Sequence, residues 1–151
     1  MIEPSAKLYA RKSDLVNKEE IFHRLNEIKQ ATDYLRKIKL EDLDNREKFL
    51  LSRYHLQIIL EAMFTIGNQI IANKVFRKPA SYKDILTVLY ENKILKKELY
   101  SRLIPLVDLR NRLVHTYWKI PKEELIEIVR NELTYFEKFV RAILEYLDHE
   151  A

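Results

Sequence analysis

The sequence predicts an all-α fold, a bundle of four main helices and one short additional helix. The 151 residues include a single glycine and four prolines, too few turn residues for a sheet protein of this size. Apolar residues also recur at helical spacing in five separate segments. The length is typical of one domain that buries its own core.

Residues 1–16 show no clean apolar period and are predicted to form an N-terminal arm. The helical domain is predicted to span residues 17–151. Residues 17–20 (Asn-Lys-Glu-Glu) resemble a capping box, which predicts that the first helix begins there. Its apolar positions continue to about Lys39, where we expect it to end.

A second capping box, at residues 44–47, opens a long second helix whose wide apolar face predicts extensive burial. Gly67 lies on that face and costs helix stability there, which indicates close approach of another helix backbone. Residues 81–84 (Ser-Tyr-Lys-Asp) then predict the cap of the short helix, and Asn92 its end.

A further helix is expected from about residue 95 to residue 118, with a kink at Pro105 because proline lacks a backbone donor. Pro121 suits the first turn of the last helix, whose apolar stripe continues to Leu147. Glu123 and Glu124 favour the positive N-terminal end of that helix.

The composition limits the possible functions. The absence of cysteine excludes disulfides and thiolate zinc sites and suits a reducing cytoplasm. The net charge of +4 and the pI of about 9.1 permit a polyanionic partner. The N-terminal segment lacks a continuous apolar run, so we expect a cytoplasmic protein without membrane attachment.

Residues 108–117 concentrate more chemically useful side chains than any other segment. They comprise Asp108, Arg110, Asn111, Arg112, His115 and Tyr117. On a helix, Asp108, Asn111 and His115 would share one face, so that Asn111 or Asp108 could fix the tautomer of the histidine. Arg110 and Tyr117 would lie on another face.

Arg110 and His115 would point roughly 140° apart on a regular helix. Either the helix is distorted near His115, or a second copy of the segment approaches across a two-fold axis. A histidine beside arginine and aspartate is also often only a surface or interface residue, so the chemistry of these residues leaves the function open.

Arg110, His115 and Tyr117 resemble the Arg-x4-His-x-Tyr motif of HepT proteins, a branch of the HEPN superfamily. Further blocks resemble the family in the same order, and the likeness extends over about residues 21–147. These blocks are residues 66–72, 78–84 and 110–117.

The resemblance implies an antiparallel HEPN-like bundle that forms a homodimer and cleaves RNA without a metal ion or other cofactor. His115 would act as a general acid or base, and Arg110 would bind the scissile phosphate. Asp108, Asn111 and Arg112 would support the site and bind RNA. The remaining histidines lie on separate segments, and no set of residues has a convincing metal-binding spacing.

HepT proteins also pair with a nucleotidyltransferase antitoxin, MntA, that attaches adenylyl groups to the motif tyrosine, here Tyr117. A packed aromatic is the simpler interpretation of Tyr117. The alternative function is a catalytically silent helical adaptor that binds a nucleotidyltransferase or a nucleotide. A third possibility is a structural dimerisation bundle that carries the motif by accident.

Overall fold

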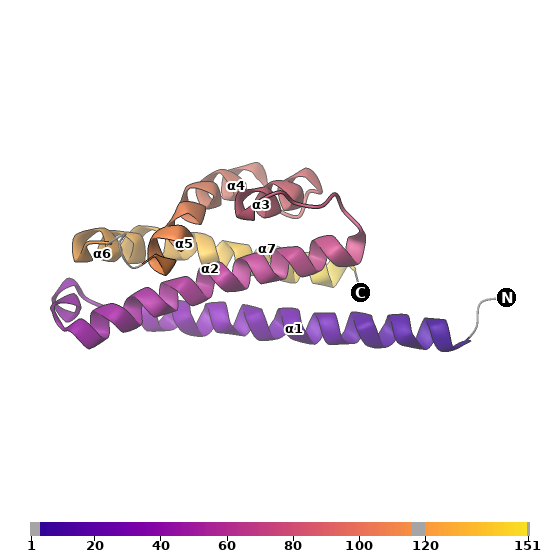
Figure 1. Ribbon diagram of the computed structural model, residues 1–151, viewed down its shortest axis with the longest axis horizontal. Coiled ribbons are helices and arrows are strands. Elements are labelled where there is room, and N and C mark those ends of the chain that lie inside the picture. The colour runs from indigo at the N-terminus through magenta and orange to yellow at the C-terminus, as the bar shows by residue number, and fades with distance from the viewer. Residues whose placement is uncertain (1–3, 116–119, 151) are drawn as a thin grey trace.

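The computed structural model describes residues 4–115 and 120–150, with side chains from Lys18 onward. Every regular element of the described residues is helical, which confirms the all-α fold (Figure 1). In chain order these are α1 (Pro4–Arg36), the 3-10 turn η1 (Leu40–Asp44), α2 (Arg46–Lys74), α3 (Tyr82–Glu91), α4 (Lys97–Leu103), the 3-10 turn η2 (Ile104–Leu106), α5 (Val107–Val114), α6 (Lys122–Asn131) and α7 (Leu133–His149).

The long helices α1, α2 and α7 form the body of the bundle, and α3 and α4 cover one side of it (Figure 1). The short connection through η1 makes α1 and α2 antiparallel neighbours. The N-terminal end of α1 extends beyond the other helices in Figure 1. No described helix is both long and apolar enough to cross a membrane.

The first helix differs from its predicted bounds at both ends. It begins at Pro4, so the predicted cap at Asn17 lies inside α1. Proline is favourable in the first turn of a helix, where its missing N–H has no intrahelical partner. The helix ends at Arg36 because Lys39 is already extended and precedes η1. The division of the chain into an arm and a domain at residue 17 stays a prediction.

Of the caps predicted for the next two helices, that of α3 is confirmed and that of α2 is displaced by one residue. The predicted box at residues 44–47 places the cap at Asp44, whereas the side chain of Asn45 accepts a hydrogen bond of 3.0 Å from the N–H of Lys48 and so caps α2. Ser81 caps α3 in the same way, at 3.1 Å from the N–H of Asp84, and α3 ends at Asn92 as predicted.

The close approach predicted at Gly67 is confirmed, with a side chain of α3 in place of another backbone. A Cβ atom at position 67 would lie 2.4 Å from Cγ2 of Ile85, well inside van der Waals contact. Glycine therefore lets α3 pack directly on α2. Because α3 and α5 both pack on α2, this contact helps to position Tyr82, at the start of α3, relative to α5.

Two helices that were predicted in the second half of the chain are each interrupted, and only the first interruption was predicted. Pro105 lies in η2 and separates α4 from α5, as expected. The predicted last helix is in fact two helices, since α6 ends at Asn131 and α7 begins at Leu133. The break lets the apolar face of α6 contact η1 while that of α7 packs along α1, which one straight helix would not allow. Pro121 occupies the N-cap position directly before α6, and so does not lie within the first turn as predicted.

Candidate active site

Helix α5 carries most of the predicted site residues and is held against α2 by its apolar face. Val107, Leu109 and Leu113 are buried, which leaves the polar residues of the segment on the outer side. The Nη2 atom of Arg53 on α2 donates to the carbonyl of Leu113 at 3.4 Å. This bond satisfies one of the terminal carbonyls that every helix leaves without an internal partner.

Arg110 lies in a defined position between α2 and α3. Its Nε donates to Oε1 of Glu61 at 2.9 Å, and its guanidinium carbon lies 4.4 Å from the centre of the Tyr82 ring. That ring packs against the ring of Phe64, at a distance of 4.7 Å between centres. Within the described part of the chain, only Nε is hydrogen-bonded, so both terminal nitrogens can donate to a phosphate.

His115 terminates α5. Its φ of −86° and ψ of 122° are extended, while its N–H still donates to the carbonyl of Asn111 at 3.1 Å. The chain therefore leaves the helix only after His115. Its φ is near the helical value and its N–H is still bonded within the helix, so its Cβ leaves α5 in about the direction that a regular helix gives. Both alternatives stated above, a distortion and a second copy of the segment, stay predictions. The histidine is exposed, as is Asn111.

Asp108 and Arg112 face neighbouring helices. A carboxylate oxygen of Asp108 lies 4.0 Å from Nζ of Lys83 on α3. Arg112 forms a two-pronged ion pair with Glu124 on α6. This hydrogen-bonded pair raises the pKa of Arg112 and lowers the pKa of Glu124. The positive charge of Arg112 is thus partly offset by Glu124.

Tyr117 belongs to residues 116–119, which lie outside the described residues. Its predicted role as a modified residue stays a prediction.

No local pattern in the sequence pairs Glu61 or Tyr82 with Arg110. Both residues are far from it in the chain, and only the packing of α2, α3 and α5 brings them together. The described residues contain no group of three His, Cys, Asp or Glu side chains that could hold a metal ion.

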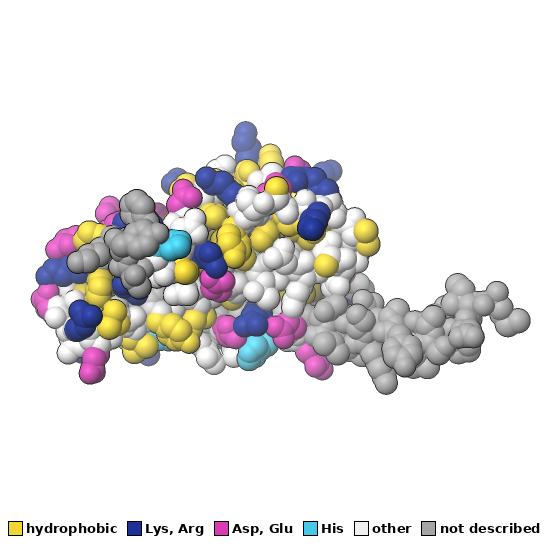
Figure 2. Space-filling view, in the orientation of Figure 1, with side chains coloured by type: hydrophobic (Ala, Val, Ile, Leu, Met, Phe, Trp, Pro, Cys, Tyr) yellow, Lys and Arg dark blue, Asp and Glu magenta, His cyan; other side chains and the backbone are white. Residues whose placement is uncertain are grey.

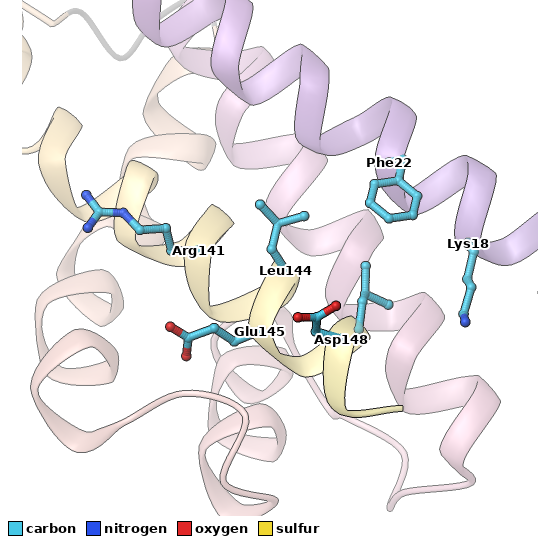
Figure 3. Close-up of a pocket in the computed structure, with 7 residues that line it drawn as sticks. Lys18, Phe22, Arg141, Leu144, Glu145 and Asp148 are labelled. Atoms are coloured by element: carbon cyan, nitrogen blue, oxygen red, sulfur yellow. The ribbon is translucent and has the colours of Figure 1, made fainter. Parts of the chain in front are cut away.

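Two hollows of the surface lie away from α5. One of about 480 Å³ lies between α1, which contributes Lys18 and Phe22, and α7, which contributes Arg141, Leu144, Glu145 and Asp148 (Figure 3). The other, of about 1000 Å³, lies between α4 and α7. Neither is lined by a residue of the motif.

The all-helical bundle is consistent with the HEPN fold that the resemblance implies. The family model described as "Ribonuclease HepT-like" matches residues 24–143. The chain belongs to the HepT-like ribonuclease family.

Named relatives agree with this assignment. The tRNA nuclease HepT of Aphanizomenon flos-aquae is 31% identical over 128 residues, which cover 82% of this chain and 87% of that protein. The mRNA nuclease HepT of Shewanella oneidensis is 26% identical over 126 residues, covering 82% and 95%. A solved structure of a tri-AMPylated Shewanella oneidensis HEPN toxin in complex with an MNT antitoxin has a TM-score of 0.76 at 24% identity and covers 83% of this chain and 97% of that one.

Proposed function

We propose that this chain is the toxin of a toxin–antitoxin pair and a metal-independent endoribonuclease that acts as a homodimer. The observation that carries the proposal is the position of Arg110, which Glu61 holds through Nε and Tyr82 through its ring, while α5 ends at His115. The mRNA and tRNA nuclease names of the two relatives support RNA as the substrate.

The proposed reaction is an internal transfer at phosphorus. His115 takes the proton of a ribose 2′-hydroxyl, the 2′-oxygen forms a bond to phosphorus, and the bond to the 5′-oxygen breaks. The 5′-oxygen takes up a proton, and the other product carries a 2′,3′-cyclic phosphate. Arg110 donates to the phosphate oxygens as their negative charge increases, and Asn111 orients the site.

A homodimer would supply the second histidine that this reaction can use as an acid. Two-fold symmetry places the same segment of both chains at one cleft. Exposed apolar side chains lie on α2 and at the end of α5, and hydrophobic side chains are visible across the face in Figure 2. The exposed residues are Leu50, Leu51, Tyr54 and Val114. Such apolar surface often marks an interface between proteins.

The purified protein should cleave single-stranded RNA in the presence of EDTA and release fragments with cyclic phosphate ends. The reason is that the groups proposed to act on the RNA are the side chains of His115, Arg110 and Asn111, which do not form a metal-binding group. Gel analysis of labelled RNA and mass spectrometry of the products measure this. Intact RNA, or cleavage that EDTA abolishes, contradicts the proposal, and intact RNA with retained nucleotide binding favours the silent adaptor.

The proposed partner is an MntA-like nucleotidyltransferase antitoxin that adenylylates Tyr117. The AMPylated toxin with its MNT antitoxin in the similar structure supports this part of the proposal. Adenylyl phosphates add negative charge and acceptor oxygens close in sequence to Arg110 and Arg112. They would compete with RNA phosphates for the same donors.

Incubation with the nucleotidyltransferase and ATP should add adenylyl groups to the wild-type chain and stop RNA cleavage. The Tyr117→Phe variant should gain none and stay active, because it lacks the acceptor hydroxyl. Intact-mass measurement and the RNA assay test both. Tyr82→Phe is the matched control and should be modified like the wild type. Equal modification of Tyr117→Phe would place the switch at another residue.

A further inference from the structure

Most of the charged side chains that line the groove between α4 and α7 are basic. Six lysines and arginines line it against three glutamates. The basic residues are Lys93, Lys96, Lys97, Arg102, Lys138 and Arg141. They come from the turn before α4, from α4 itself and from α7, so positive charge lies on both walls.

These basic side chains lack the carboxylate partners that some other basic residues of the described chain have. Within the described residues, none of the six forms an ion pair. Elsewhere, Arg77 is held by Asp84 and Glu91. One of the three glutamates in the groove, Glu150, is itself paired with Lys74. The groove therefore has an excess of positive potential over its immediate surroundings.

The floor of the groove is aromatic and firmly placed. Tyr135 and Tyr146 are partly buried and pack against the hydrophobic core. The guanidinium carbon of Arg102 and Nζ of Lys138 each lie 5.5 Å from the centre of the Tyr135 ring, one from each wall. Basic walls beside aromatic rings are the combination with which proteins bind single-stranded nucleic acids. The volume of about 1000 Å³ is at the upper limit of small-molecule pockets, roughly 300–1,000 Å³, and suits an extended chain.

We propose that this groove binds the backbone of single-stranded RNA outside the cleavage site. The inference rests on the proposed function, since it takes RNA as the substrate. Helix α4, one wall of the groove, continues through η2 into α5, which carries Arg110. RNA held beside Lys97 and Arg102 is therefore held by the helix that directly precedes the site.

The test compares two double variants with the same loss of charge. Lys97→Gln with Lys138→Gln changes both walls of the groove, whereas the α1 variant, Lys29→Gln with Lys37→Gln, changes one exposed residue of α1 and the exposed residue that follows the helix. The probe is a fluorescent single-stranded RNA with 2′-O-methyl groups, which lacks the attacking hydroxyl and stays uncleaved. Fluorescence anisotropy at several salt concentrations measures its Kd.

The groove variant should bind this RNA roughly ten-fold more weakly than the wild type, because it loses two phosphate contacts. The slope of log K against log salt should fall by about 1.4, since each contact to a single strand contributes about 0.7. The α1 variant should match the wild type. Equal binding of the RNA by both variants overturns the proposal. Equal affinity of the wild type for a duplex of the same sequence also overturns it. So does a groove variant that changes its self-association and keeps its RNA affinity.

Two further outcomes distinguish failure of the proposed nuclease function from failure of the RNA groove. If the groove variant loses binding while the wild type leaves unmodified RNA intact, the RNA groove stands and the proposed nuclease function does not. If the wild type cleaves RNA and the groove variant binds and cleaves equally well, the nuclease function stands and the RNA groove does not.

Discussion

Replacing His115 with alanine should reduce RNA cleavage by roughly 10²- to 10⁴-fold, the usual contribution of a general acid or base. His115 is exposed and lies just beyond the last residue of α5, so its side chain contributes little to the core. The variant should therefore keep the helical content and thermal stability of the wild type. Initial cleavage rates at saturating RNA, together with circular dichroism, measure the two effects separately.

His23→Ala is the matched control for this experiment. His23 is also exposed and lies on α1, where its Nε2 is 3.0 Å from Oε1 of Glu27 on the same helix. Its loss should leave the cleavage rate unchanged. A folded His115→Ala protein that cleaves RNA at the wild-type rate would remove His115 from the reaction.

Replacing Arg110 with alanine should lower kcat by roughly 10²- to 10³-fold, as expected for the loss of a donor that stabilises negative charge in the transition state. Arg110→Lys should recover little of this activity. Lysine keeps the positive charge, but it cannot donate through two parallel bonds to a phosphate. Single-turnover kinetics of the three proteins measure the effect, and Arg130→Ala, on the exposed face of α6, is the control. Full activity in Arg110→Lys would mean that charge is sufficient and that paired hydrogen bonds are unnecessary.

A mixing experiment tests whether the cleft is shared between two chains. If Arg110 of one chain acts with His115 of the other and the second histidine is not needed, a dimer of one Arg110→Ala chain and one His115→Ala chain has one complete pair. Random exchange in an equal mixture should then restore about one quarter of the wild-type activity. No recovery in a mixture that light scattering shows to be dimeric and exchanged would place both groups of a working site in the same chain.

The local features of the fold could be predicted from the sequence because they depend on neighbouring residues. Ser81 and Asn45 cap helices through hydrogen bonds to residues on the next turn. Pro105 interrupts its helix because any proline in a helix interior removes a backbone hydrogen bond. The predicted start of α1 was wrong, because the capping pattern at residues 17–20 lies inside the helix. Nothing local marks the break at Glu132, which depends on the positions of η1 and α1.

The site could be predicted only as a set of residues in one segment. Arg110 and His115 were found from their spacing, but the partners that orient Arg110 were not. Glu61 and Tyr82 come from two other helices, and their contact with Arg110 depends on the packing of α3 over Gly67. Similarly, the pairing of Arg112 with Glu124 requires α6 to fold back beside α5.

The contacts of Arg110 also bear on the thermodynamics of RNA binding. A free arginine side chain has a conformational entropy worth about 2 kcal/mol, much of which it loses when it binds a phosphate. Here the ion pair to Glu61 and the stacking on Tyr82 restrict the side chain as the protein folds. Most of this entropy is therefore lost before RNA arrives, so the guanidinium is preorganised and the binding step itself is less opposed.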